Sequence, residues 1–492
     1  MTAPATASPT IRTRITIASP WAVAVWAAAG LYAVLLSVES IYDHDSFWSG
    51  FDVAIYDQRL WLLANWHDPF STVVSRPFLA DHFEPGLVLL TPLYWLGLGV
   101  PGMLTAQSIG LALTAPALFA LGRASGASPA LASIPAFLWL ASPAVATANL
   151  FDFRPLTFAP VLLVLSVLAV VRDRPVLLAV TAVLALSLKE EMALIYVMLG
   201  LLLVYHGRRR LGAILAMGSA ACFVVGLAII RSLGDSDKWF GRRFAGDRGD
   251  TFAEAFVYMV RHPLDTVTDA LGHSGFDLLV LVLSTSGLAF LAPAWILLSA
   301  PTILHNALSA YEPQHDLIHH YHVPVLTAVF IAAAIGAGRL NSLGLLGRRL
   351  VAVGIAVAVA SALVGGVRQH SLSGRPSGDE RAAIRRALDR IPPDVPVAAA
   401  PVLLPHLSHR VELYSLPEPF VRLDWGSPLT SEEYAERAAR VRFVALAGGM
   451  QPTEFEGEIE DVHAQLLKQG FVEVANSRAG YIVILERRNP SD

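Results

Sequence analysis

The chain has 492 residues, of which 54% are hydrophobic and only 15% are charged, whereas soluble domains usually carry about 25% charged residues. This composition excludes an ordinary soluble protein and indicates a protein embedded in a membrane. The net charge of −4 and the short, scattered arginine clusters exclude a nucleic-acid groove or a polybasic tail. The single cysteine, Cys222, excludes an intrachain disulfide framework and cysteine-based zinc or iron–sulfur sites.

The N-terminal residues 1–19 precede an apolar stretch and carry no small-residue cleavage pattern. We therefore expect a cytoplasmic N-terminus followed by a first transmembrane helix, rather than a removed signal peptide. Lysine occurs only at Lys189, Lys238 and Lys468, and this preference for arginine fits a GC-rich bacterial genome. A bacterial cytoplasmic membrane is the expected location.

Apolar stretches of roughly 15 to 22 residues recur along the first two thirds of the chain and predict about 11 transmembrane helices. They are 20–39, 102–121, 129–148, 156–171, 176–188, 191–206, 211–231, 276–291, 293–309, 321–338 and 350–366. The segment 86–98 is also apolar, but it is short for a bilayer and contains Pro92. It predicts an interfacial or re-entrant helix.

The distribution of arginine tests this layout, because short cytoplasmic loops of membrane proteins are rich in Lys and Arg. With the N-terminus inside, the predicted cytoplasmic turns hold Arg123, Arg172, Arg174, Arg208, Arg209, Arg210, Arg339, Arg348 and Arg349. The long polar segments then all face the other side of the membrane. They are the first external loop 41–101, residues 149–154 and 189–191, the external loop 232–275, and residues 311–322.

After about residue 367 the apolar runs shorten to strand length and charged residues become frequent. A helical pattern over 378–391, short strand-like runs, a helix near 457–469 and a hairpin over 471–488 predict a small α/β domain. The expected fold is therefore an all-α polytopic membrane domain over 20–366, followed by a soluble extracytoplasmic α/β domain over 367–492. The latter carries no nucleotide-binding or nucleophile-elbow pattern, so we assign it no chemistry.

The first external loop holds the leading catalytic candidates, since a hydroxyl that attacks an activated sugar or phosphate needs a carboxylate to take its proton. Asp52 is the first choice for this base, although it is equally suited to be the N-cap that starts a helix in the amphipathic stretch FDVAIYDQRLWLLA. His82 and Glu84 flank Phe83 and could relay a proton, or simply form a polar turn before the next apolar segment. Asp57 is a candidate substrate contact.

Charged groups in the next two external turns are candidates for substrate binding. Asp152 and Arg154 form either a local ion pair or a substrate contact, and a guanidinium suits a phosphate. Lys189, Glu190 and Glu191 interrupt two apolar runs with almost no loop between them. Ionisable residues in such a setting are functional candidates, and the alternative is a hairpin tip at the water interface.

The remaining external candidates are histidines and arginines. His315 and His319 have the spacing of a metal-binding pair if their segment is helical, while His319, His320 and His322 are candidate substrate contacts or part of a solvated loop. Arg242 and Arg243 belong to a basic patch that suits a polyprenyl phosphate or anionic lipid headgroups. No cofactor is identified, but a divalent cation such as Mg²⁺ or Mn²⁺ has candidate ligands in Asp52, Glu190, His315 and His319.

Several of these segments together resemble a family of uncharacterised prokaryotic polytopic membrane proteins, domain of unknown function 2079. The resemblance covers most of residues 20 to 480. It is carried by FDVAIYDQRLW at 51–61, HFEP at 82–85, LVLLTPLYWL at 87–96, FDFRP at 151–155, SLKEEMAL at 187–194, RHPLDTV at 261–267, HHYHVPVLTAVF at 319–330 and the run from Ile391 to Pro417.

That family is similar, in its first external loop and helix layout, to the C-type membrane glycosyltransferases. These multispanning enzymes use polyprenyl-phosphate sugars at the extracytoplasmic face, and an acidic residue of their first external loop serves catalysis. The resemblance implies this role for Asp52, with Asp45 as a rival.

The leading hypothesis is thus a glycosyltransferase that moves a sugar from a polyprenyl-phosphate donor to an unknown acceptor outside the membrane. Two alternatives stay open: a lipid-linked sugar transporter or flippase, and a non-enzymatic membrane scaffold of the cell envelope. A transporter predicts ionisable residues distributed through the membrane, whereas here they gather on one side. Neither the sugar nor the acceptor follows from the sequence.

Overall fold

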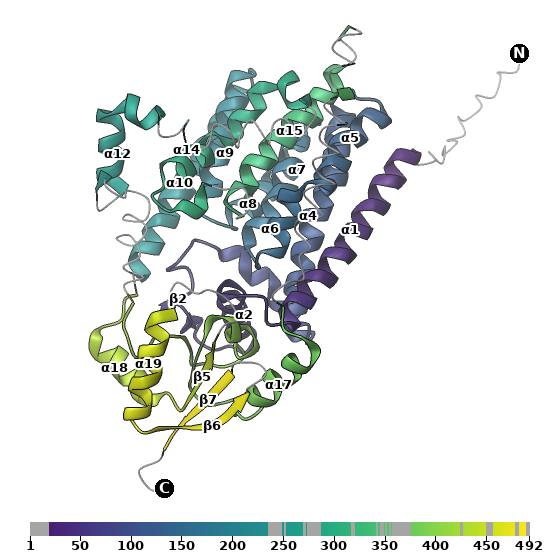
Figure 1. Cartoon of the computed structure of the whole chain (residues 1–492). Helices are drawn as coiled ribbons and strands as arrows, with labels where there is room; N and C mark the ends of the chain where they lie inside the picture. The colour runs from purple at the N-terminus through teal and green to yellow at the C-terminus, as the bar shows by residue number, and fades with distance from the viewer. Residues whose placement is uncertain are drawn as a thin grey trace, which may run out of the picture.

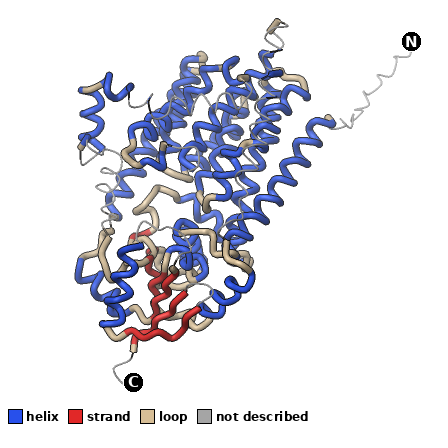
Figure 2. The backbone as a smooth tube through the Cα atoms, in the orientation of Figure 1, coloured by secondary structure: helices blue, strands red, loops and turns tan. Residues whose placement is uncertain are grey.

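The computed structural model divides into a bundle of helices and a smaller unit that contains a sheet (Figures 1 and 2). It describes residues 19–234, 287–315, 320–340, 375–423, 427–448, 456–477 and 482–488, together with short pieces between 248 and 356. The first helix, α1, runs along the bundle and ends beside the sheet-containing unit. Polar residues that terminate the helices at this end therefore meet the C-terminal part of the chain.

Four described helices are long and apolar enough to cross a membrane, and a fifth span results if a pair bent by 45° is counted as one. The long ones are α1 (Pro20–Asp45), α4 (Gly99–Ala124), α10 (Arg209–Leu233) and α15 (Val323–Arg339), the last extended by the short 3₁₀ helix η7 (His320–His322). The bent pair is α5 (Pro129–Ala141) and α6 (Pro143–Leu150). The chain is thus a multi-pass membrane protein.

Shorter helices account for most of the other predicted spans. They are η2 (Pro155–Phe158) with α7 (Ala159–Val171), α8 (Pro175–Leu186), α9 (Glu191–Tyr205), and η5 (Pro293–Ser299) with α14 (Ala300–Leu308). The predicted spans 276–291 and 350–366 lie largely outside the described residues. The described helices therefore establish several apolar spans without confirming a total of 11.

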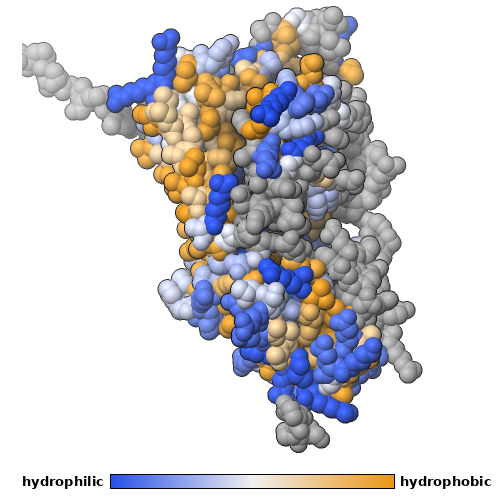
Figure 3. Space-filling view, turned by 90° about the vertical axis from the view of Figure 1, so that its left-hand side faces the viewer, coloured by the Kyte–Doolittle hydropathy of each residue, from blue (hydrophilic) through white to orange (hydrophobic). Residues whose placement is uncertain are grey.

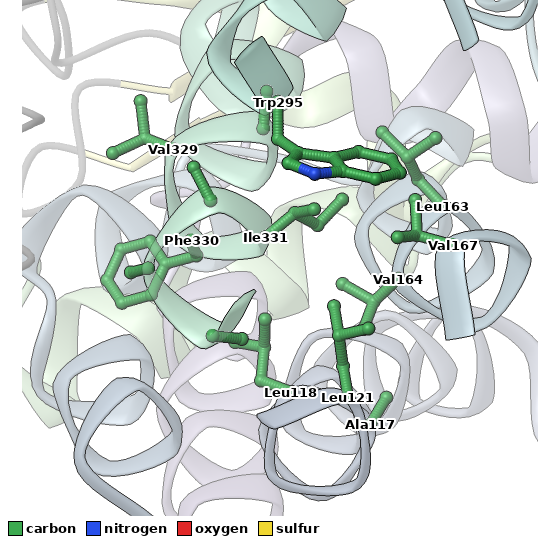
Figure 4. Close-up of a cluster of buried hydrophobic side chains, with 14 of the residues drawn as sticks. Ala117, Leu118, Leu121, Leu163, Val164, Val167, Trp295, Val329, Phe330 and Ile331 are labelled. Atoms are coloured by element: carbon green, nitrogen blue, oxygen red, sulfur yellow. The ribbon is translucent and has the colours of Figure 1, made fainter. Parts of the chain in front are cut away.

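The core of the bundle forms around α15, whose span is 89% buried. Figure 4 shows Val329, Phe330 and Ile331 of this helix among Trp295, Leu163, Val164 and Val167, with Ala117, Leu118 and Leu121 of α4 on the other side. One outward face of the bundle is also largely apolar, as the orange surface over part of the helical region in Figure 3 shows. A helix that is apolar on all sides suits a membrane, because lipid replaces water around it.

The segment predicted as interfacial or re-entrant contains two short helices instead of a span. They are η1 (Pro85–Leu90) and α3 (Thr91–Trp95). A small piece of the later loop, α12 (Phe252–Arg261), lies beside the bundle and away from the sheet in Figure 1. Two further short 3₁₀ helices of the bundle are η4 (Leu288–Leu291) and η6 (Glu312–Gln314).

The C-terminal unit is built on a five-stranded sheet in the order β4-β3-β5-β7-β6. The strand β3 pairs in parallel with both β4 and β5, while β7 pairs antiparallel with β5 and β6. The strands are β3 (Val397–Ala399), β4 (Leu413–Ser415), β5 (Phe443–Ala447), β6 (Phe471–Ser477) and β7 (Ile482–Arg487), and the helices are α17 (Gly378–Leu388), η9 (Pro401–His406), α18 (Ser431–Arg440) and α19 (Glu456–Lys468). The predicted hairpin is β6 and β7.

Residues between α1 and η1 form the junction of the two parts. They contain α2 (Phe51–Ala64) and the short strands β1 (Phe70–Ser71) and β2 (Arg76–Pro77). Apolar side chains of this segment share one buried cluster with the C-terminal unit: Phe47, Ala54, Ile55, Val73 and Val74 lie with Ile384, Leu403, Leu404 and Leu413. The first loop is therefore part of a folded interface rather than a free solvated loop.

Candidate active site

Asp52 lies in the first turn of α2 and points to a second polar turn of the bundle. The N-cap of α2 is Gly50, so the alternative interpretation of Asp52 as the cap was wrong. Its carboxylate instead forms an ion pair with Arg154, and the backbone N–H of Gly50 donates to Asp152 Oδ1 at 3.1 Å. Arg154 is therefore paired with a residue 102 positions away and not with its neighbour Asp152.

The buried side-chain amide of Gln107, which was not predicted as a site residue, holds the turn that contains Asp152 and Arg154. Gln107 of α4 is fully buried, and its Nε2 donates to the carbonyl oxygens of Asn149 and Asp152 at 2.8 and 3.1 Å. Its Oε1 accepts from the Arg154 N–H at 2.8 Å and from the Thr157 hydroxyl at 3.2 Å. A polar side chain inside an otherwise apolar helix was the available signal for this role.

His82 makes the second contact between distant loops. Its Nδ1 lies 2.9 Å from Glu190 Oε1, and Glu190 Oε2 accepts the backbone N–H of Phe83 at 2.9 Å. Lys189 lies 3.4 Å from Glu191, so the three charged residues of this turn divide between two ion pairs. The structure thus brings together segments 82–84 and 189–191, as the common external placement predicted.

Glu84 is buried within a network that extends along α2. The Tyr56 hydroxyl donates to Glu84 Oε1 at 3.0 Å, and Arg59 Nη1 lies 3.8 Å from Glu84 Oε2. Arg59, which is 1% exposed, also pairs with Asp81 at 3.5 Å, and Arg76 pairs with the same carboxylate at 2.8 Å. Tyr56 and Arg59 were not predicted as site residues, although both occur in the helix that begins beside Asp52.

Burial and neighbouring charges set the protonation of these groups. Burial, reinforced by the charge of Asp52, raises the pKa of Asp152 to about 7. Burial likewise raises the pKa of Glu84. Burial opposes a charged imidazole at His82, but Glu190 outweighs this effect and raises the pKa of His82. Burial also opposes a charged carboxylate at Glu190, but His82 and Lys189 outweigh it and lower the pKa of Glu190 to about 2. The site therefore combines an imidazole whose charged form is favoured with one carboxyl group, that of Asp152, whose pKa lies near neutral pH.

Several buried polar atoms of this region have no hydrogen-bond partner within the described part of the protein. They are Arg154 Nε, Arg59 Nε, Glu84 Oε2 and Asn149 Oδ1. Buried polar groups are normally paired, and each exception calls for an explanation such as water or a ligand. These atoms belong to the Asp52–Arg154 pair, to the Glu84 network and to the turn beside them, so this end of the bundle is the candidate site.

Asp57 occupies a different environment one and a half turns further along α2. It is fully buried and accepts hydrogen bonds from Tyr94 at 2.5 Å, from the Ser408 hydroxyl and from His409 at 3.2 Å. Two of these donors belong to the C-terminal unit, so the contacts of Asp57 join α2 to that unit. The rival base Asp45 is about half exposed and lies 3.8 Å from Arg385 of α17.

The histidine segment reaches the site through its last residues. His320 and His322 are buried, and the ring of His320 lies 6.1 Å from Phe151, over which Arg154 is placed at 5.9 Å. His315 is close to the carbonyl of Ser309 at 2.8 Å. Among the described residues, no three His, Cys, Asp or Glu side chains are grouped so as to hold a metal ion. His319, Arg242 and Arg243 lie outside the described residues.

The chain is similar to a known protein family and to solved structures. A family model described as "Predicted membrane protein (DUF2079)" matches residues 43–432. Two solved structures of ArnT from Cupriavidus metallidurans share the fold at 14% identity: one bound to undecaprenyl phosphate, with a TM-score of 0.55 over 94% of this chain and 98% of that chain, and one in the apo state, with a TM-score of 0.53 over 93% and 98%. No curated protein matches the sequence significantly. The predicted membership of the DUF2079 family is confirmed, and the likeness to ArnT is one of fold.

Proposed function

Because the chain belongs to the DUF2079 family of predicted membrane proteins and shares the fold of ArnT, we propose that it is a C-type glycosyltransferase. It moves a sugar from a polyprenyl-phosphate donor to an acceptor on the extracytoplasmic face of a bacterial membrane. The ArnT structure with undecaprenyl phosphate supports this class of lipid partner. In this proposal the membrane holds about 11 helices, with the N-terminus in the cytoplasm and the α/β unit outside.

The observation that carries the proposal is the meeting of charged residues from distant loops at one end of the bundle. Asp52 contacts Arg154, His82 contacts Glu190, and Lys189 contacts Glu191. A transferase with an activated donor needs one base and several cations for the phosphate that leaves. This group of side chains supplies both.

In the proposed reaction, Asp52 takes the proton of an acceptor hydroxyl while the hydroxyl oxygen bonds to the anomeric carbon of the sugar. The bond between that carbon and the phosphate oxygen breaks, and polyprenyl phosphate leaves with the electron pair. Arg154 orients the Asp52 carboxylate, which keeps about one fifth of its side-chain surface exposed (21%) for an incoming hydroxyl.

Cationic groups stabilise the phosphate anion in this scheme. Burial opposes the charge of Lys189, but Glu191 and Glu190 outweigh it and raise the pKa of Lys189, so its ammonium persists at neutral pH. Tyr321 lies within electrostatic range of both Lys189 and Arg154. His320 and His322 would orient the substrate, and a divalent cation at Asp52 or Glu190 remains part of the prediction.

A binding experiment tests the lipid partner directly. We expect the purified protein in detergent to bind undecaprenyl phosphate in native mass spectrometry, and Lys189→Gln to weaken that binding about tenfold or more, as expected for a lost charge-assisted contact. The matched control is Arg208→Gln, which removes a half-exposed cation paired with Asp173 at the other end of α9. Equal binding by wild type and both variants would contradict the phosphate site.

A further inference from the structure

Residues 86–98 present two apolar faces, only one of which is covered by protein. Leu87 and Thr91 are buried, and the Tyr94 hydroxyl reaches inward to Asp57. The other face is open: Leu89 is 65% exposed and Leu96 is 73% exposed. Since no charged residue occurs between Glu84 and Arg123, the exposed face has no charged side chain of its own to meet water.

Two tryptophans extend this face to the end of α2. Trp66, directly after α2, is 85% exposed and stacks on Trp95 with ring centroids 6.4 Å apart. The indole N–H of Trp95 donates to the carbonyl of Ala64 at 3.0 Å, which ties α3 to the last turn of α2. We call the combined surface the tryptophan patch, consisting of Trp66, Val88, Leu89, Trp95, Leu96 and Leu98.

The tryptophan patch lies between a helix that can cross a membrane and a polar loop. Leu98 is followed directly by α4, which is long and apolar enough to cross a membrane and exposes Ile109 and Leu113 further along. At its other edge, Trp66 lies between the exposed polar residues Asn65 and His67. An apolar surface that continues a membrane-spanning helix on one side and ends in tryptophan beside polar residues is typical of the membrane–water interface.

We propose that the tryptophan patch lies in the headgroup region of the bilayer, on the membrane side that faces the C-terminal unit, and anchors the end of α2 there. The helix α2 has 14 residues and is therefore about 21 Å long, with Asp52 in its first turn and Trp66 just beyond its last. Fixing one end at the lipid surface fixes the height of Asp52 relative to the membrane.

Spin labelling tests this placement, and the chain is convenient for it because Cys222 is its single cysteine. In a Cys222→Ala background, Leu96→Cys or Leu89→Cys is labelled with a nitroxide and the full-length protein is reconstituted in lipid nanodiscs. We expect collisions with oxygen to exceed collisions with a water-soluble nickel chelate at both positions. The control label at Asp68→Cys, an exposed residue beside the tryptophan patch, should show the reverse order.

The competing outcomes are distinct. Nickel collisions at residues 89 and 96 as frequent as at residue 68 would place the tryptophan patch in water and overturn the proposal. Dipolar broadening that disappears when labelled protein is diluted with unlabelled protein would show a second copy in place of lipid, and would also overturn it. Two labelled positions guard against a single variant that fails to fold, and the helical circular dichroism of each variant is compared with that of the parent.

Discussion

Two carboxylates of the same helix have opposite environments in this protein. Asp52, in the first turn of α2, pairs with an arginine of the helical bundle, keeps 21% of its side chain exposed, and lies near buried polar atoms without partners. Asp57, five residues later, is fully enclosed and has three donors, two of them from the C-terminal unit.

The difference shows which polar groups are available for chemistry. A buried network whose members are all satisfied stabilises one arrangement of the chain, whereas a network with unfilled positions can accept a further molecule. Asp57 belongs to the first kind and Asp52 to the second. The proposed substrate contact at Asp57 remains a prediction, but its three hydrogen bonds favour a structural role.

The largest effect is expected for the partly exposed Asp52 in the first turn of α2. Asp52→Asn should lower the release of polyprenyl phosphate from lipid-linked sugars by about 10²–10⁴-fold, because general base catalysis contributes about that much. Mass spectrometry of membrane lipids extracted from the producing cells and incubated with the purified enzyme measures this release. The melting temperature should stay close to that of wild type, and a variant that retained full turnover would remove Asp52 from the reaction.

The next effect concerns Arg59, the buried arginine that pairs with Asp81 and Glu84. Arg59→Met leaves Asp81 and Glu84 without their fully buried cation, and breaking such a pair costs about 3–5 kcal/mol. Thermal unfolding in detergent, followed by circular dichroism, should show this loss. Arg385→Met is the control, because Arg385 and Asp45 are both more than half exposed and such pairs contribute about 0–1 kcal/mol. Equal stability of the two variants would show that Arg59 is not structurally important.

A smaller loss of stability is expected at the fully buried Asp57. Asp57→Asn replaces one acceptor oxygen by an amide and leaves at least one of Tyr94, Ser408 and His409 without its acceptor, which costs about 1–3 kcal/mol. We expect faster amide hydrogen exchange in η9 and the start of β4, while the exchange of α4 is unchanged. Asp68→Asn in the exposed loop nearby is the control. Unchanged exchange in η9 would indicate that Asp57 does not hold the two parts together.

The last effect is a pH dependence of stability at Asp152. Its pKa is raised from 3.8 to about 7 in the folded protein, so the folded state holds a proton that the unfolded chain loses first. The resulting stability is complete below about pH 3.8 and is lost as the pH rises through about 7. The melting temperature of Asp152→Asn relative to wild type should therefore increase across this range. Asp173→Asn, at a carboxylate that is 79% exposed, should show no such trend.

Much of the architecture follows from local patterns. Long apolar runs predicted a polytopic helical protein, the alternation of residues 471–488 predicted the hairpin of β6 and β7, and the arginine distribution grouped the polar loops on one side. The contacts of His82 with Glu190 and of Asp52 with Arg154 agree with that grouping. The apolar runs did not predict the lengths of several helices. The helices α8 and α9 are shorter than a usual membrane span.

Hydropathy and charge act on each residue locally, so they were enough to predict the class of the protein and the set of polar residues that face one another. The partner of each residue depends on how distant segments pack. Asp57 accepts a hydrogen bond from Ser408, which is 351 positions away, and Arg154 pairs with Asp52 and not with the nearby Asp152. These choices depend on how α2, the bundle and the C-terminal unit pack together, and side chains five residues apart on one helix accordingly acquire different surroundings.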